Sequence, residues 1–122
     1  MMLVLDASAV LAYLQGEPGS EMVRQALAHQ SVCSAANWSE IAQKSLQAGR
    51  DWPAARQLLQ GYGLHVEPVT PADAEWAAIH WVDHKHLALG DRLCLALAHR
   101  LGATALTADA AWGSSDSIQQ IR

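Results

Sequence analysis

The sequence predicts an α/β fold in which a central parallel sheet of four to five strands lies between two layers of helices. Short apolar runs, typical of strands buried on both faces, alternate with longer segments in which apolar residues recur at helical spacing. Glycine and proline punctuate the boundaries between these segments. A length of 122 residues suits one hydrophobic core, so we expect residues 1–122 to form a single domain with right-handed crossovers.

The first half of the chain predicts two strands and four helices. In order, we expect a strand over 2–5, a helix over 7–15, a helix from 20, a strand over 31–35, a helix over 37–48 and a helix from 51 to 62. Ser20 is expected to cap the second helix, and Asp51 with Pro53 to open the fourth. Leu58 and Leu59 belong to the predicted apolar face of that helix.

The second half predicts two helices and three strands, one of them at an edge of the sheet. We expect a strand over 64–69, a helix from 71 to about 84, a helix over 91–101, a strand over 104–107 and a last strand within 117–121. Pro68 cannot donate a ladder hydrogen bond and so favours an edge position. Thr70 and Asp73 predict a capping box, and Gly102 a helix end. The inward side chains of the capped helix are expected to be Ala72, Trp76 and Ile79.

Composition narrows the classes of function. Eight basic and twelve acidic residues give a formal charge of −4, and no basic stripe indicates nucleic-acid binding. An RNA or DNA substrate would therefore need metal ions, a few arginines or a second subunit. Cys33 and Cys94 lie in apolar runs without metal-ligand spacing, which favours reduced, buried thiols. The N-terminus is not typical of a signal peptide and no run reaches membrane-spanning length, so we expect a soluble, cytoplasmic protein with no membrane partner.

Four acids stand where this fold turns strands into helices: Asp6, Glu40, Asp91 and Asp109. Two follow buried strands and two lie in predicted first helical turns, so all four should meet at the carboxyl edge of the sheet. An all-oxygen pocket of this kind suits Mg²⁺ or Mn²⁺ and phosphoryl chemistry. Because like charges repel, we expect raised carboxyl pKa values in the metal-free protein and a higher melting temperature with either ion.

Each acid also has a purely structural interpretation. Asn37 and Glu40 come close to a capping box, and Asp91 is a residue type favoured at a helix N-terminus. Asp6 and Asp109 could be ordinary turn residues. Taken singly, caps are commoner than metal ligands; it is the predicted meeting of all four at one sheet edge that favours a site.

Four segments carry a resemblance to a known family: LVLDASAVLAYLQGEPG, NWSEI, LGDRLCLALA and LTADAAW. In order and spacing they resemble a PIN-domain ribonuclease over essentially the whole chain, and more narrowly a VapC-type toxin of a bacterial type II toxin–antitoxin system. The resemblance implies a three-layer αβα PIN-like fold. It also implies that Asp6, Glu40, Asp91 and Asp109 form the acidic quartet, both catalytic and metal-binding, with supporting positions at Ser8, Asn37 and Thr107.

The family resemblance also implies an activity and partners. Its members are divalent-metal-dependent endoribonucleases that cut single-stranded regions of RNA such as tRNA, rRNA or mRNA, usually as homodimers silenced by a cognate VapB-like antitoxin. By this resemblance, Asp6, Asp91 and Asp109 would hold Mg²⁺ or Mn²⁺, while Glu40 orients the attacking water and the products carry a 5′-phosphate and a 3′-hydroxyl. Arg92 would contact a phosphate or pair with a nearby acid.

Two other functions compete with this interpretation. A non-catalytic PIN-like interaction module should lack one or more of the acids, and none is missing. A haloacid dehalogenase-type phosphatase needs a second acid where Ser8 stands and a lysine in its later motifs, whereas the only lysines are Lys44 and Lys85.

Some remaining polar residues fit no motif. The spacing of His80, His84 and His86 would allow a zinc site, but a solvated helix end is favoured because a fourth ligand is lacking. Asp116 could be an extra acid, but the surrounding WGSSDS departs from the family pattern, so it does not belong to the predicted site.

Overall fold

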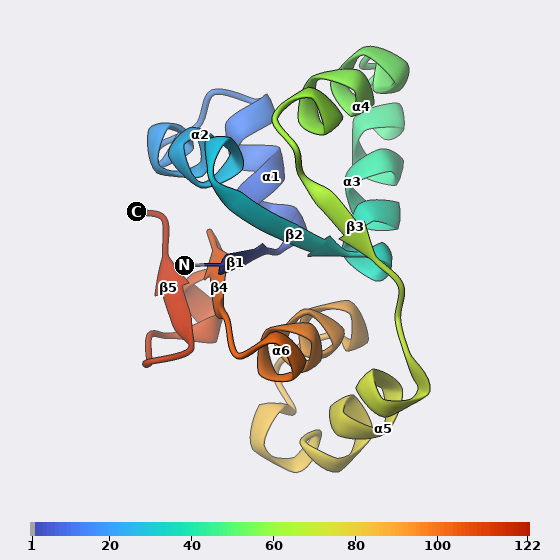
Figure 1. Cartoon of the computed structure of the whole chain (residues 1–122), viewed down its shortest axis with the longest axis vertical. Coiled ribbons are helices and arrows are strands. Elements are labelled where there is room, and N and C mark those ends of the chain that lie inside the picture. The colour runs from blue at the N-terminus through green and yellow to red at the C-terminus, as the bar shows by residue number, and fades with distance from the viewer. Residues whose placement is uncertain (1) are drawn as a thin grey trace.

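Five parallel strands form the centre of the protein, whose computed structural model describes residues 2–122 (Figure 1). They are β1 (Met2–Leu5), β2 (Gln30–Ser34), β3 (His65–Glu67), β4 (Thr104–Thr107) and β5 (Ile118–Gln120). Their order across the sheet is β3-β2-β1-β4-β5, and each neighbouring pair is parallel. The predicted parallel sheet is confirmed, and β3 lies at one edge as expected, although the strand ends at Glu67 and does not include Pro68.

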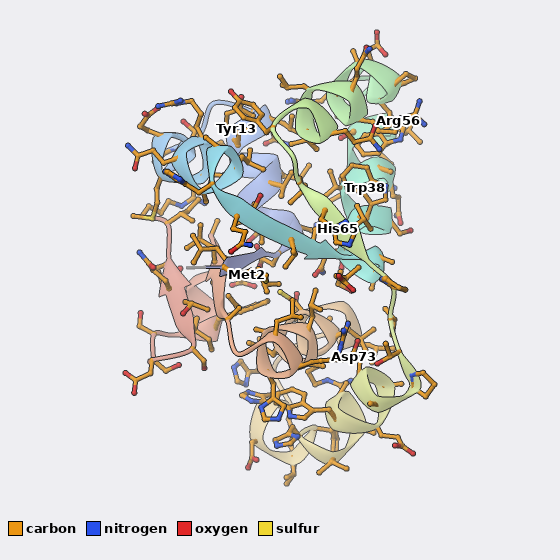
Figure 2. The ribbon with its side chains drawn as sticks, in the orientation of Figure 1. Met2, Tyr13, Trp38, Arg56, His65 and Asp73 are labelled. Atoms are coloured by element: carbon orange, nitrogen blue, oxygen red, sulfur yellow. The ribbon has the colours of Figure 1, made fainter. Side chains whose placement is uncertain are left out.

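Helices cover both faces of the sheet. They are α1 (Ala7–Leu14), α2 (Ser20–Ala28), α3 (Ala35–Gln47), α4 (Trp52–Gly61), α5 (Pro71–Ile79) and α6 (Leu89–Leu101), with short 3-10 turns η1 (Val82–His84) and η2 (Ala110–Trp112). Helices α1 to α4 lie on one side, and α5 and α6 on the other (Figure 1). Figure 2 shows Trp38 and Arg56 on the first side and Asp73 on the second. The predicted three-layer arrangement is confirmed.

The core is divided by the sheet into two halves. Adjacent residues of β1 face opposite sides: Leu5 packs with Ile41 of α3, and Val4 packs with Leu97 of α6. All four side chains are buried, as expected for a central parallel strand. Cys33 is also buried and free, and burial raises its pKa to about 12, which keeps it a neutral thiol.

Three helix starts differ from the sequence prediction, one of them that of α6, which begins at Leu89 rather than at Asp91. Ser20 does not cap α2; the preceding Gly19 occupies the cap position with φ of 92°, where a side chain would collide with the Ile121 backbone. Helix α3 begins before Asn37, because the Ser34 hydroxyl accepts a hydrogen bond from the Ala36 N–H (3.2 Å) and caps the helix. The first helical residue is therefore Ala35, two residues earlier than expected.

Two inward faces were predicted only in part, and Trp76 does pack against the core as expected. Ile79 is 71% exposed, Ala72 is exposed, and α5 ends at Ile79 rather than near His84. The buried residues of α5 are Asp73 and Ala77, because the capping box and an arginine partner pull Asp73 inward. Leu58 of α4 is 46% exposed while Leu59 is buried, so the apolar face of α4 is narrower than its sequence indicated.

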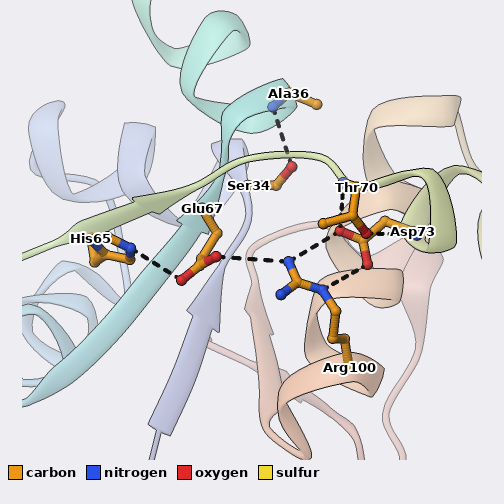
Figure 3. Close-up of polar contacts among 7 residues, drawn as sticks. All are labelled: Ser34, Ala36, His65, Glu67, Thr70, Asp73 and Arg100. Atoms are coloured by element: carbon orange, nitrogen blue, oxygen red, sulfur yellow. Dashed lines mark hydrogen bonds and ion pairs between the residues drawn. The ribbon is translucent and has the colours of Figure 1, made fainter.

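A partly buried ion pair joins α5 to α6 (Figure 3). The Arg100 guanidinium donates to both oxygens of Asp73 at 3.0 and 3.2 Å, and lies 3.8 Å from Glu67 of β3. Thr70 completes the predicted capping box around the same carboxylate. Burial alone would raise the pKa of Asp73, but the hydrogen bonds from Arg100 and Thr70 outweigh it and lower that pKa.

Across residues 2–122, no helix is both long enough and apolar enough to cross a membrane.

Candidate active site

The Asp6 carboxylate is fixed at the carboxyl end of β1, where it caps α1. Its Oδ1 accepts a hydrogen bond from the Ala9 N–H at 2.8 Å, and the Ser8 hydroxyl donates to both oxygens at 2.8 and 2.9 Å. The Thr107 hydroxyl donates to Oδ2 at 2.6 Å. Only 2% of Asp6 is exposed. Sequence-distant groups therefore hold this carboxylate in one orientation.

The same two hydroxyls fix the backbone that leads to Asp109. Ser8 Oγ accepts a hydrogen bond from the Ala108 N–H at 2.9 Å, and Thr107 Oγ1 accepts one from the Asp109 N–H at 3.0 Å. Because β1 and β4 are neighbours, with Leu5 opposite Leu106, Asp6 and Asp109 leave the sheet at the same edge. The predicted supporting positions Ser8 and Thr107 thus lie in contact with Asp6; their effect on catalysis stays a prediction.

Glu40 and Asp91 reach this edge from two helices. Since α3 starts at Ala35, Glu40 lies in its second turn rather than its first. Asp91 lies in the first turn of α6 and accepts a hydrogen bond from the Ala88 N–H at 3.2 Å. One of its oxygens therefore does cap the N-terminus of this helix, as its structural interpretation required. Asp109 uses one oxygen similarly, accepting from the Ala111 N–H at 2.9 Å.

Asn37 joins these two helices instead of starting one. Its amide Nδ2 donates to Glu40 Oε1 at 3.1 Å and to the Gly90 carbonyl at 3.3 Å. The capping interpretation of Asn37 was therefore wrong, and Glu40 does not reach back to the Asn37 backbone. Gly90 was missed altogether. The signal that could have found it is a glycine in a helical first turn, next to an acid, where the backbone does not require one.

Asp91 interacts electrostatically with each of the other three acids. Burial, slightly reinforced by the Asp91 charge, raises the pKa of Asp6 to about 6 despite its hydrogen bonds. Burial also raises the pKa of Asp91, with further contributions from Glu40 and Asp109. The expected rise is confirmed for Asp6 and Asp91, but its main cause is loss of water rather than mutual repulsion.

The side chains at this edge match a hard divalent cation in donor type. All four candidate ligands are carboxylates, and within residues 2–122 one oxygen each of Glu40, Asp91 and Asp109 accepts no protein hydrogen bond. In that same part of the chain, no three His, Cys, Asp or Glu side chains are already close enough to form a metal cage. The carboxylates thus offer free oxygen atoms to a cation, but they are not arranged as a closed metal site.

Arg92 does not join the acids. Its Nη1 donates to the Ala77 carbonyl of α5 at 2.7 Å. One residue along a helix is a rotation of about 100°, so Asp91 at the sheet edge places Arg92 toward α5. The structure does not support the predicted phosphate contact.

The remaining polar candidates lie elsewhere. His84 and Asp116 line a cavity of about 480 Å³ beside Thr104. Thr104 is the first residue of β4, so this cavity lies at the amino ends of the strands, away from the acids at their carboxyl ends. His80 stacks on Trp76 with ring centroids 4.0 Å apart. Packing against an aromatic ring, rather than zinc binding, accounts for the position of His80.

Comparison with family models and known sequences gives a consistent result. Residues 3–114 match the model described as PIN domain. The chain is 32% identical over 113 residues to ribonuclease VapC42 of Mycobacterium tuberculosis, covering 82% of this chain and 85% of that protein. A VapC ribonuclease of Mycobacterium bovis matches to the same extent.

Solved structures show the same fold at lower sequence identity. A toxin–antitoxin complex from Klebsiella pneumoniae superposes with a TM-score of 0.83 at 16% identity, covering 98% of both chains. VapBC2 of Rickettsia felis, bound to a promoter DNA fragment, gives 0.72 at 11% identity and 98% coverage of each chain. Mycobacterium tuberculosis VapC20, a toxin that cleaves the sarcin–ricin loop, gives 0.71 at 18% identity, covering 93% of this chain and 97% of that one.

Proposed function

The chain belongs to the PIN-domain family and to its VapC ribonucleases, and from that premise we propose that it is a divalent-metal-dependent endoribonuclease. We propose that it cuts single-stranded regions of RNA, in tRNA, rRNA or mRNA, as the toxin of a bacterial toxin–antitoxin pair. The observation that supports the proposal most is the placement of the acids: Asp6 and Asp109 follow neighbouring strands at one end of the sheet, and Asp91 interacts electrostatically with Asp6, Glu40 and Asp109. A non-catalytic module has no need of four acids at one edge.

The chain's own residues suggest how the reaction would proceed. In this proposal Asp6, Asp91 and Asp109 hold Mg²⁺ or Mn²⁺, which when bound supplies a Lewis acid that polarises the scissile phosphate and acidifies water. Glu40 orients the attacking water and accepts its proton. Ser8 and Thr107 keep Asp6 in one orientation. In-line attack of the water oxygen on phosphorus would break the P–O3′ bond; the leaving 3′-oxygen would take up a proton from solvent, so that the products are a 5′-phosphate and a 3′-hydroxyl.

RNA cleavage with matched variants tests this function. Purified protein should cut a structured RNA in Mg²⁺ or Mn²⁺ but not in EDTA, leaving 5′-phosphate ends. Asp91→Asn keeps the side-chain shape but removes a ligand charge, and should reduce the rate by at least about 100-fold. Equal rates for wild type and Asp91→Asn would identify a contaminating nuclease and refute the assignment.

We also propose that the protein binds a VapB-like antitoxin and forms a homodimer. The VapBC assemblies among the structural neighbours support an antitoxin partner. Support for a dimer comes from the segment that runs from the last residue of α5 to the first residue of α6, which exposes four large apolar side chains: Ile79, Trp81, Val82 and Leu89. Exposed apolar side chains that gather into one patch favour a protein interface, so a second copy of this chain is the occupant we propose for this segment.

The dimer proposal makes a specific prediction. Light scattering of the free protein should give about twice the 13.1 kDa chain mass, and Val82→Lys should give the monomer, because a buried unpaired ammonium opposes association. Leu46→Lys is the control, since Leu46 of α3 is also 60% exposed but lies outside this segment. A dimer lost with Leu46→Lys and kept with Val82→Lys would place the interface elsewhere.

A further inference from the structure

Gly90 occupies a helical position that does not require glycine. It lies in the first turn of α6, and it is absent from the glycines with positive φ, which are Gly16, Gly19, Gly49, Gly63, Gly102 and Gly113. Glycine destabilises a helix relative to alanine because it loses more backbone freedom on folding. A reason for glycine at this position must therefore come from its neighbours.

The neighbour is the Glu40 carboxylate. A Cβ atom on Gly90 would overlap Glu40 Oε1 and lie 3.3 Å from Glu40 Cδ, closer than nearly all real Cβ contacts. The missing side chain thus leaves the space in which a carboxylate of α3 rests against the backbone of α6. Asp91 follows directly, and the Glu40 charge contributes to its raised pKa.

Asn37 holds the same contact from the other side. The residue is completely buried, and its Nδ2 donates both to Glu40 Oε1 and to the Gly90 carbonyl. Its Oδ1 is buried with no hydrogen-bond partner among the described residues, which costs stability. The chain has asparagine at this position although the buried Oδ1 lowers its stability. Because the Nδ2 group bonds to both α3 and α6, we infer that Asn37 does more than fill space.

We propose that Gly90 and Asn37 are positioning residues that hold the Glu40 carboxylate against the first turn of α6, beside Asp91. The inference rests on the proposed function, in which Glu40 orients the attacking water. A side chain at position 90 would displace Glu40 rather than the helix, because the contact is with the end of a flexible side chain. The fold should survive while the carboxylate moves.

Kinetics of Gly90→Ala test this displacement. The rate kcat should fall by about 10-fold or more with KM changed less than about twofold, since orientation of the water and not RNA binding is affected. Gly61→Ala is the matched control. Gly61 of α4 is also helical, but a Cβ atom at this position would meet no atom of residues 2–122 within 4 Å, so kcat should stay at the wild-type value.

A double-mutant cycle in metal-free protein tests the contact without relying on activity. Gly90→Ala should raise Tm by about 3 °C when Glu40 is already alanine, as Gly61→Ala should in the wild type, because helix propensity then acts alone. With Glu40 present, Gly90→Ala should give little or no gain. Equal gains in both backgrounds would mean that the two residues do not interact and would overturn the proposal.

Asn37→Ala should lower kcat in the same way, against Ser45→Ala as control. Ser45 is another buried polar residue of α3 whose hydroxyl lacks a partner in the described chain, so its loss should leave kcat unchanged. Wild-type kcat in both Gly90→Ala and Asn37→Ala would refute positioning even if the enzyme is a ribonuclease. If the wild type cuts no RNA, the proposed function fails, and the Tm cycle alone then decides whether Gly90 contacts Glu40.

Discussion

Asp6→Asn should reduce RNA cleavage by about 1000-fold or more and, in the same protein, raise the stability of the metal-free fold. We expect a larger loss of activity than for Asp91→Asn, because Asp6 is the acid whose surroundings fix it most completely, through Ser8, Ala9 and Thr107. Loss of residues that only orient a metal ligand typically costs 10- to 100-fold, so losing a ligand charge should cost more.

The stability gain follows from the buried charge. The pKa of Asp6 is about 6 in the folded protein, against an ordinary value of 3.8, so the folded state binds more protons between these values. Wild-type stability therefore falls as pH rises from about 4 to about 6, by at most about 3 kcal/mol, and stays low above pH 6. Asparagine carries no charge and should escape this loss. The Tm difference in EDTA should thus be near zero at pH 4 and several degrees at pH 8.

Divalent ions should make the wild type more stable than Asp6→Asn, the reverse of the order expected in EDTA. Mn²⁺ should raise the Tm of the wild type at pH 8, because an ion that binds only the folded state stabilises it, and should leave Asp6→Asn nearly unchanged. Asp109→Asn is the matched control: Asp109 is exposed, so cleavage should fall without a gain in Tm in EDTA. An Asp6→Asn protein less stable than wild type at pH 8 in EDTA would show that hydrogen bonds to the carboxylate outweigh its burial.

The strands and the two acids that follow them were predictable from local pattern. Continuous apolar runs define β1 and β4, and an acid directly after such a run must lie at the carboxyl edge. The pattern did not establish that the two strands are neighbours. That depends on strand order, which local sequence does not encode, and the Thr107 to Asp6 hydrogen bond is its direct consequence.

The contacts between helices were not predictable in the same way. Asn37 read alone looks like a cap, and only the start of α3 at Ala35 turns its amide toward Gly90. Arg92 read alone looks like a phosphate ligand, and only the packing of α6 against α5 supplies the Ala77 carbonyl that it binds. In both cases a tertiary partner decides between two possibilities that the local sequence leaves open.

Arg100→Met should destabilise the fold more than other substitutions of a charged residue away from the four acids. Asp73 has a side chain only 4% exposed, and it accepts two hydrogen bonds from Arg100. Removing the cation leaves a buried carboxylate with only its Thr70 contacts. Breaking a buried pair costs about 3–5 kcal/mol; because Arg100 is 31% exposed, we expect about 2 kcal/mol and a Tm lower by roughly 5–10 °C.

The pH dependence of Tm shows whether the lost ion pair causes the lower stability of Arg100→Met. Because the folded pKa of Asp73 lies below its ordinary value, the pair stabilises the protein above about pH 4, and this contribution disappears as pH falls through the folded pKa. The Tm difference between wild type and Arg100→Met should therefore be constant near neutrality and shrink below pH 4. A difference that persists unchanged at low pH would mean that lost packing of the arginine stem is responsible.

Arg24→Met provides the comparison between two ion pairs of similar geometry. Arg24 also contacts a carboxylate, Glu21, at 2.6 Å, but the two side chains are 46% and 66% exposed. Water screens that pair and its side chains lose entropy on pairing, so Tm should stay essentially unchanged. If Arg24→Met and Arg100→Met lowered Tm equally, burial of Asp73 would not be what makes the α5–α6 pair stabilising.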